Sequence, residues 1–354
     1  MSQTEKNKPK IGITIGDYNG VGVEVILKAF SDNRLFDYCT PVVYGSTKII
    51  AYHKKALKID TVNHQQLKPA SSPSPKVLNV VNCIDENVII NLGTASQQAG
   101  EAALVALDTA LKDLKEGTID ALVTAPLDKS LIKPKTGTFT GHTEYIANYF
   151  GVAETVMVLT CDFIKVGLVT NHIPVKDVAA ALTGKKILTK IEILNESLFK
   201  DFGIAKPKIA VLGLNPHAGD NGLLGTEEKE IILPAIKKAQ ENGILAYGPY
   251  AADGLMGSGQ YDKFDVVLAM YHDQGLVAFK SLCFGNGVNF TAGLPVVRTS
   301  PDHGTAFDIA GKNLALPDSF REAVFTAIDV ARNRKVYNEI TANPLKKQKI
   351  ENEQ

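Results

Sequence analysis

The feature that most constrains the fold is a repeated alternation between short β-rich runs and segments with helical spacing. Residues 11–15, 41–44 and 119–124 are runs rich in apolar and β-branched residues, and segments with apolar residues at helical intervals lie between them. This alternation is typical of βαβ units, in which a helix connects two parallel strands. The sequence therefore predicts an α/β protein built on a largely parallel sheet.

The same pattern assigns most of the remaining chain. Further strands are expected at 156–160, 165–170, 208–214 and 265–271, the first two as a neighbouring pair. Helices are expected at 21–30, in a segment ending near 57, and at 95–115, 174–182, 185–201, 227–241 and 317–333. Residues 64–76 contain three prolines and three serines, so we expect a surface connection there.

Charge and hydropathy exclude several classes of protein. Lys plus Arg and Asp plus Glu both number 38, so the net charge is zero, whereas a dedicated binder of nucleic acid or anionic membrane needs a basic excess. No apolar run approaches the roughly 18 residues of a membrane span, and the polar first ten residues lack the core of a signal peptide. With 354 residues, and roughly 150 per domain, we expect a soluble cytoplasmic protein of two domains.

The cysteines agree with a cytoplasmic location. Cys39, Cys83, Cys161 and Cys283 lie far apart and form no C-x-x-C pair, which disfavours a zinc knuckle and a redox dithiol. Four cysteines in a chain of this length are also too few for a disulfide scaffold.

Three of the seven histidines directly follow apolar runs. His172 ends KVGLVTNH, His217 ends KIAVLGLNPH and His272 ends DVVLAMYH. Ligands of open parallel sheets bind outside the carboxyl ends of the strands, so these imidazoles are expected at one rim. Three neutral imidazoles with an open position form a catalytic site for zinc or a similar divalent metal. One such histidine would more often cap a loop, but three in the same topological position favour the metal.

Two glycine-containing segments could hold an anion at the start of a helix. Gly16–Gly22 follows the first strand but lacks the third glycine of a dinucleotide fingerprint, so a ligand contact and a tight strand-to-helix turn are equally compatible with it. Residues 140–144 open another helix with a hydroxyl, an imidazole and free backbone N–H groups, which suit a phosphate or a carboxylate. The alternative for this second segment is an ordinary N-cap.

Downstream, cationic and amide side chains stand in a stretch otherwise rich in glycine and apolar residues. Lys280 follows the apolar residues 276–279, Arg298 ends the apolar run 294–297, and Asn289 lies between them. Such cations either pair with buried acids or bind an anionic substrate, and Arg can hold a carboxylate or phosphate with two parallel hydrogen bonds. No Gly-x-Ser-x-Gly elbow is present, so covalent hydrolysis has no support.

Together these segments carry a family resemblance. TGHTEY, TNHIPV, GLNPHAGDNGLLGTEE, AMYHDQGLVAFK and GNGVNFTAGLPVVRTSPDHGTAFDIAG occur in this order. The chain resembles the 4-hydroxythreonine-4-phosphate dehydrogenase family of vitamin B6 biosynthesis from residue 11 to about residue 333. The resemblance implies two α/β/α domains with a cleft between them, similar to isocitrate and isopropylmalate dehydrogenases, and a homodimer. We expect residues 1–125 with 265–354 in one domain, and 126–264 in a second that carries part of the metal site and the dimer interface.

The resemblance also implies roles for individual residues. The metal ligands, which meet at the dimer interface, would be His172, His217 and His272. The substrate contacts would be His142, Thr143, Lys280, Asn289 and Arg298. The adenine side of the nicotinamide cofactor would lie against residues 303–312, among them His303, Gly304, Thr305 and Asp308. Asp253 and Asp273 match acidic positions near the family's site, and we assign them catalytic roles.

The implied reaction is oxidation of 4-phosphooxy-L-threonine by NAD or NADP, followed by loss of carbon dioxide to give 3-amino-2-oxopropyl phosphate. One divalent ion per site (zinc, magnesium or cobalt) would assist by binding the reacting oxygen. The chain departs from relatives in the loop 15–23, where their prolines are missing, and at Asp128, where some relatives have histidine. Threonate or erythronate 4-phosphate is therefore the alternative substrate, and a metal-dependent phosphatase is a more distant alternative function.

Overall fold

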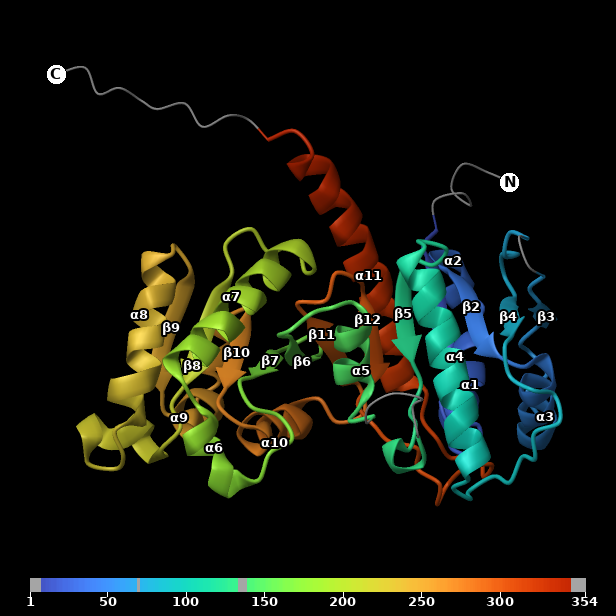
Figure 1. Ribbon diagram of the computed structural model, residues 1–354, viewed down its shortest axis with the longest axis horizontal. Helices are drawn as coiled ribbons and strands as arrows, with labels where there is room; N and C mark the ends of the chain where they lie inside the picture. Colours follow the sequence, from blue (N-terminus) through green and yellow to red (C-terminus); the bar gives the residue numbers. More distant parts are fainter. Residues whose placement is uncertain (1–7, 69–70, 133–138, 345–354) are drawn as a thin grey trace.

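The strands form one continuous sheet in a computed structural model that describes residues 8–68, 71–132 and 139–344 (Figure 1). Its strand order is β3-β4-β2-β1-β5-β12-β11-β6-β7-β10-β8-β9. The strands are β1 (Lys10–Thr14), β2 (Thr40–Gly45), β3 (His64–Gln66), β4 (Leu78–Asn82), β5 (Ala121–Thr124), β6 (Val156–Thr160), β7 (Lys165–Leu168), β8 (Lys208–Leu212), β9 (Leu245–Tyr250), β10 (Val266–Ala269), β11 (Val288–Ala292) and β12 (Arg298–Pro301).

Two parallel groups of strands meet in the middle of the sheet. Strands β3, β4, β2, β1, β5 and β12 are parallel to one another, and so are β7, β10, β8 and β9. Between the groups, β11 is antiparallel to both β12 and β6, and β6 is antiparallel to β7. The predicted α/β class and the predicted strand pair at 156–170 are confirmed.

Helices cover the strands on both sides of this central region. They are α1 (Gly22–Phe30), α2 (Leu35–Tyr38), α3 (Thr47–Leu57), α4 (Gln97–Lys115), α5 (His142–Tyr149), α6 (Val175–Ala181), α7 (Gly184–Lys200), α8 (Leu233–Glu241), α9 (Ala252–Gly257), α10 (His272–Leu282) and α11 (Asp318–Thr341). Short turns of other helix types occupy η2 (Lys129–Leu131), η3 (Pro216–Gly222), η4 (Glu228–Ile232) and η5 (Gln260–Lys263). None of the helices in the described ranges is both long and apolar enough to cross a membrane.

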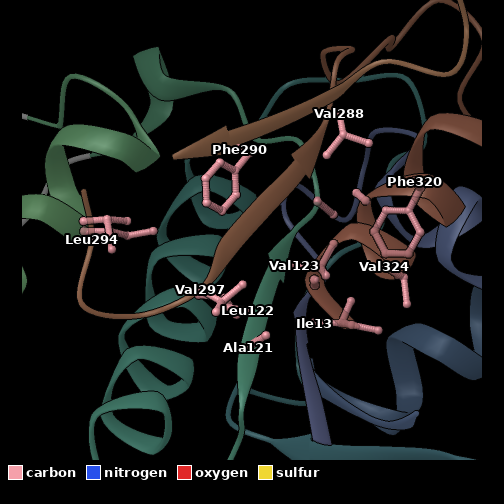
Figure 2. Packing of buried hydrophobic residues seen from close by; sticks show 14 of the residues in the cluster. Ile13, Ala121, Leu122, Val123, Val288, Phe290, Leu294, Val297, Phe320 and Val324 are labelled. Carbon is pink, nitrogen blue, oxygen red and sulfur yellow. The ribbon is translucent and has the colours of Figure 1, made fainter. Parts of the chain in front are cut away.

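Apolar side chains from α11 pack on the central strands of the sheet. Phe320 and Val324 of this helix are fully buried, and the helix packs on β5, β11 and β12. Figure 2 shows them close to Ile13 of β1 and Val123 of β5, and Phe290 of β11 belongs to the same cluster of buried residues. Burying such side chains stabilises the fold by about 1.5–3 kcal/mol each. This packing holds the middle of the sheet, where the candidate site lies.

A second, smaller core fills the other group of strands. It contains Met157 and Leu159 of β6, Val166 of β7 and Phe279 of α10. The disulfide between Cys161 and Cys283 borders this core and connects positions 122 residues apart in sequence. Sequence spacing could not indicate this pairing, because the two cysteines become neighbours only when α10 packs beside the β6–β7 hairpin. The predicted division into two domains remains a prediction. Strand β10, which was assigned to the first domain, pairs with β7 and β8, which were assigned to the second.

Several elements differ from the sequence-based expectation. The expected surface connection at 64–76 begins with the short strand β3, whose glutamines are exposed and give no apolar signal. Strands β4, β9, β11 and β12 were not predicted, and β9 contains a glycine and a proline that mask its strand pattern. Helix α11 continues to Thr341, beyond the expected end near 333. The sequence pattern missed its last two turns because most of their residues are exposed and lack apolar spacing.

Candidate active site

A cavity of about 530 Å³ lies where the two groups of strands meet. Its wall combines the end of β5, the start of α5, the segment after β7, and parts of α10, β11 and β12. The lining includes Thr124, Asp128, Lys129, His142, Thr143, Glu144, Met157, Asn171, His172, Lys280, Asn289, Arg298, Asp302, His303, Gly304 and Thr305. All five predicted substrate contacts therefore reach one cavity, although the first and the last are 156 residues apart in sequence (142 to 298).

Arg298 is a buried cation without an anionic partner in the described part of the chain. Only 3% of the residue is exposed, and its guanidinium donates to the Thr124 hydroxyl from Nε (3.2 Å) and Nη2 (2.8 Å), and to the Thr291 hydroxyl (3.4 Å). Burial lowers its pKa to about 10, and the nearby Glu144 carboxylate opposes this shift. The side chain remains charged at neutral pH. Of the two alternatives left open by the sequence, pairing with a buried acid is not found, which favours binding of an anionic ligand.

His142 faces the same cavity as a neutral imidazole. It is the first residue of α5, whose N-cap residue is Gly141 and has no side-chain cap. Burial and the positive charge of Arg298 lower the pKa of His142 well below its usual value. Its Nε2 atom is buried and has no hydrogen-bond partner among the described residues. The free N–H groups of the helix start and this imidazole fit the anion-binding alternative better than an ordinary capped helix.

Other polar atoms around the cavity also lack partners in residues 8–68, 71–132 and 139–344. They are Oδ1 of Asn171, Oδ1 of Asn289 and Nε2 of His303, all buried. Buried polar atoms in proteins are nearly always hydrogen-bonded, so several unsatisfied atoms on one cavity wall indicate a missing polar ligand.

Lys280 and Asp302 form the passage to a second cavity. Their Nζ and Oδ2 atoms are 3.3 Å apart, and burial raises the pKa of Asp302 while the Lys280 ammonium opposes the rise. Both residues, with His303, also line an adjoining cavity of about 350 Å³. The rest of that cavity is mainly apolar, with Val25, Ile309, Leu314, Ala315 and Leu316. A long ligand with one polar and one aromatic end could occupy both.

Two of the three predicted metal ligands lie side by side. Hydrogen bonds between the segments after β7 and β10 join Val169 N to the Ala269 carbonyl (2.9 Å) and Thr170 N to the Met270 carbonyl (3.2 Å). This register places His172 beside His272, with ring centroids 5.6 Å apart. Both line a hollow of about 200 Å³ that shares Asn171 and His172 with the main cavity.

The third predicted ligand, His217, is exposed on the irregular segment after β8. Across the described residues of one chain, no group of three His, Cys, Asp or Glu side chains is arranged to hold a metal ion. The pair formed by His172 and His272 nevertheless fits a metal chemically. His272 Nδ1 lies 2.7 Å from the Asp273 carboxylate, and a proton shared there leaves Nε2 free as a ligand.

The predicted cofactor residues divide into two groups. His303, Gly304 and Thr305 line the main cavity, whereas Asp308 is exposed and borders neither of the two adjoining cavities. Asp253 in α9 is likewise exposed and lies away from both cavities. Asp273 touches His272 rather than the main cavity.

The first glycine loop contacts the segment that was predicted to bind the cofactor. Val21 N donates to the Thr305 carbonyl (3.0 Å), and a Cβ on Gly20 would approach that same carbonyl oxygen to 2.7 Å. Lys28 Nζ donates to the carbonyls of Asn313 (3.0 Å) and Ala315 (2.8 Å). Of residues 16–22, Val21 lines the apolar cavity and the other six line neither cavity, so the structure is compatible with both alternatives for this loop.

Sequence reasoning missed several lining residues. Asn171 and Asp302 directly precede the predicted His172 and His303, so their motifs contained the signal. Glu144 likewise lies in the 140–144 segment, although no role was assigned to it. Thr124 gave no signal, because a single hydroxyl at a strand end is common in any α/β protein.

Comparisons with known proteins point to one family. Residues 37–327 match the family model described as pyridoxal phosphate biosynthetic protein PdxA. A 4-hydroxythreonine-4-phosphate dehydrogenase of Bacteroides thetaiotaomicron is 54% identical, with 98% of this chain and 95% of the relative covered. A relative from Oceanobacillus iheyensis, 40% identical over 92% of this chain and 98% of its own length, is provisionally named a D-threonate 4-phosphate dehydrogenase. The crystal structure of the Klebsiella pneumoniae 4-hydroxythreonine-4-phosphate dehydrogenase has a TM-score of 0.82 and 33% identity, covering 92% of this chain and 98% of that one.

Proposed function

The chain belongs to the family of the pyridoxal phosphate biosynthetic protein PdxA, and from this premise we propose that it oxidises and decarboxylates 4-phosphooxy-L-threonine. The products would be 3-amino-2-oxopropyl phosphate, carbon dioxide and the reduced nicotinamide cofactor. The observation that carries the proposal is the buried, uncompensated Arg298, which lies in a cavity with several unsatisfied polar atoms. Such a cavity suits a small substrate with two anionic ends.

Binding of the substrate falls to residues around Arg298. The planar guanidinium has donors left after its bonds to Thr124 and Thr291, and it can hold a phosphate or carboxylate with two of them. The neutral His142 can donate or accept a hydrogen bond at Nε2 without adding charge. Thr143, at the start of α5, and Asn289, on β11, supply further polar contacts from the opposite walls.

A divalent metal would be held by His172 and His272, with His217 supplied by a second copy of the chain. The chemistry that such an ion supplies is Lewis-acid stabilisation of negative charge on the reacting oxygen. Asp273 orients His272 through the 2.7 Å contact at Nδ1. We therefore propose that Asp273 orients a metal ligand, in place of the catalytic role predicted from the sequence. Asp253 has no contact that explains a catalytic role, and its assignment stays a prediction.

A homodimer would complete this site. His172 and His217 are both exposed in the single chain, and Val175 and Leu223 beside them are apolar with 74% and 79% of their surface exposed. Exposed apolar residues next to incomplete ligands favour an interface with a second copy over a free surface.

NAD would accept the hydride, with its adenine end in the apolar cavity and its nicotinamide end toward the substrate. Lys280, Asp302 and His303 line both cavities, so one cofactor molecule can extend from the apolar cavity into the main cavity. Lys280 can hold the second anionic end of the substrate, and Asp302 fixes the Lys280 ammonium from the other side. We therefore propose substrate binding for Lys280 and cofactor binding for residues 303–305.

The test is to incubate the metal-loaded protein with NAD or NADP and 4-phosphooxy-threonine, threonate 4-phosphate or erythronate 4-phosphate in parallel. We expect the absorbance of reduced nicotinamide to rise together with carbon dioxide release for 4-phosphooxy-threonine. A faster reaction with threonate 4-phosphate would support the alternative suggested by the Oceanobacillus relative. Phosphate release without nicotinamide reduction would show a phosphatase and refute the proposal.

A further inference from the structure

The segment that carries His217 has an unusual backbone. His217, Ala218, Asp220 and Asn221 have φ angles of 53°, 52°, 43° and 57°, and Gly219 between them has 82°. Four non-glycine residues in the left-handed region within one short segment are unfavourable for L-amino acids. Such a conformation persists only where the surrounding structure imposes it, and it occurs mainly at functional sites.

A buried carboxylate holds this segment from within. Glu228 is only 4% exposed, and its Oε1 accepts hydrogen bonds from the backbone N–H groups of Leu214 and Asn215, both at 2.7 Å. Its Oε2 accepts from the Asn215 side-chain amide at 3.0 Å. These bonds fix the backbone two and three residues before His217, and the intervening Pro216 further limits its freedom.

The carboxylate also touches the far side of the turn. A Cβ at Gly219 would lie 2.6 Å from Glu228 Oε2, so the chain passes directly over this oxygen. The His217 ring itself is exposed and has no hydrogen bond among the described residues. Its position in space therefore depends on the backbone on both sides, and both sides are set by Glu228.

We propose that Glu228 is a positioning residue that presents His217 to the divalent metal. The inference rests on the proposed function, because it takes His217 as a ligand. Glu228 does not itself reach the metal, since its two oxygens are buried and occupied by Leu214 and Asn215. Its role is to hold the strained turn in the one conformation that places the imidazole outward.

Glu228→Gln tests this role with almost no change in volume. The new amide can keep its oxygen toward the two backbone N–H groups, but its NH₂ then faces the Asn215 amide, donor against donor. Asn215 cannot simply rotate, because its amide also donates to Glu227 at 2.7 Å. We expect the affinity of the full-length, metal-stripped protein for Zn²⁺, measured by competition with a chelating dye, to fall about tenfold or more. Glu230→Gln, an exposed change in the same short helix, is the matched control and should bind Zn²⁺ as the unmodified protein does.

Gly219→Ala provides a second perturbation of the same contact without a change of charge. The added methyl would displace Glu228 Oε2, so Zn²⁺ affinity should again fall. Alanine at a φ of 82° is also strained and should lower the melting temperature, so an unchanged far-ultraviolet circular dichroism spectrum below the unfolding transition shows that the fold is kept. Unchanged Zn²⁺ affinity in both variants would overturn the proposal.

A double-mutant cycle separates positioning from general damage. If Glu228 acts through His217, then Glu228→Gln should not weaken Zn²⁺ binding further in a chain that already carries His217→Ala. An equal loss in both backgrounds would show a purely structural role and overturn the proposal. If His217→Ala alone leaves Zn²⁺ affinity unchanged, the metal assignment in the proposed function fails and this inference fails with it. If only His217→Ala weakens binding, the proposed function stands and this inference alone is wrong.

Discussion

Replacing Arg298 with methionine should lower kcat/KM strongly without destabilising the ligand-free protein. The fall of the Arg298 pKa from 12.5 to about 10 corresponds to about 3 kcal/mol of unfavourable free energy for the buried charge, at about 1.4 kcal/mol per pKa unit. Methionine removes that energy but leaves the Thr124 and Thr291 hydroxyls without their partner, at about 1 kcal/mol each. The net effect is a gain of about 1 kcal/mol, or about 1 °C in Tm for a chain of this length.

Activity should move in the opposite direction. Loss of two charge-assisted hydrogen bonds to the substrate, at about 1.5–3 kcal/mol each, lowers kcat/KM by at least about a hundredfold. Arg298→Lys keeps the charge but not the planar donors, so a fall of about ten- to a hundredfold is expected. Inorganic phosphate should raise the Tm of the unmodified protein and leave that of Arg298→Met unchanged.

Arg334 provides the control within the same chain. It is also buried, but its Nε lies 2.6 Å from the buried Asp201 carboxylate, far from the candidate site. Arg334→Met leaves that carboxylate unpaired and should destabilise the protein by about 3–5 kcal/mol, with kcat/KM near normal at low temperature. The reasoning would be refuted if Arg298→Met proved as destabilising as Arg334→Met, or if it retained normal kcat/KM.

The remaining predictions concern the metal, the cofactor and pH. His272→Ala should lower metal content, measured by elemental analysis, in parallel with activity, and full activity with normal metal occupancy would contradict the assignment of this ligand. Ile309→Trp should fill the apolar cavity and raise the KM for NAD about tenfold or more while the KM for the substrate stays unchanged; equal effects on both would argue against an adenine site there. Asp308 lies outside both cavities but was predicted to bind the cofactor. Asp308→Ala should raise the KM for NAD and not that for the substrate, and an unchanged KM for NAD would show that Asp308 does not contact the cofactor. Lys280→Met removes the cation that opposes the raised pKa of Asp302, so this pKa should rise further and the acidic limb of the kcat/KM profile should move to higher pH; a limb that stays in place would show that Asp302 does not control it.

The sequence predicted elements whose apolar pattern is strong and missed those without one. Strands β7, β8 and β10 are buried apolar runs, and each was found together with the histidine that follows it. Strand β12 is short and begins with Arg298, so its composition resembles a loop although all four of its residues are buried. Its position in the sheet depends on pairing with β11 and β5, which no local pattern can reveal.

The candidate site shows the same difference between what a local sequence pattern predicts and what it misses. The strand-end pattern predicted that His172, His217 and His272 would lie at one rim, and within the described residues of one chain only His172 and His272 lie side by side. The grouping of His142 with Arg298 in one cavity followed from the family resemblance and not from a strand-end pattern. Sequence patterns could not predict that Arg298 lacks a counter-ion, since this depends on which side chains from β5 and β11 surround it. Nor could they predict the position of His217, whose distance from His172 and His272 depends on a left-handed turn that few sequences adopt.

Helix α10 has a consequence for which molecules the enzyme can accept. It begins at His272 beside the metal hollow and carries Lys280 in its last turn, facing the main cavity. Eight residues of α-helix advance about 12 Å along the axis, and a packed helix does not stretch. With the proposed roles of His272 and Lys280, the helix sets the spacing between the backbone positions that carry the metal ligand and the cation. A substrate shorter by one carbon atom should then bind more weakly, because the Lys280 side chain would have to change conformation to keep its contact.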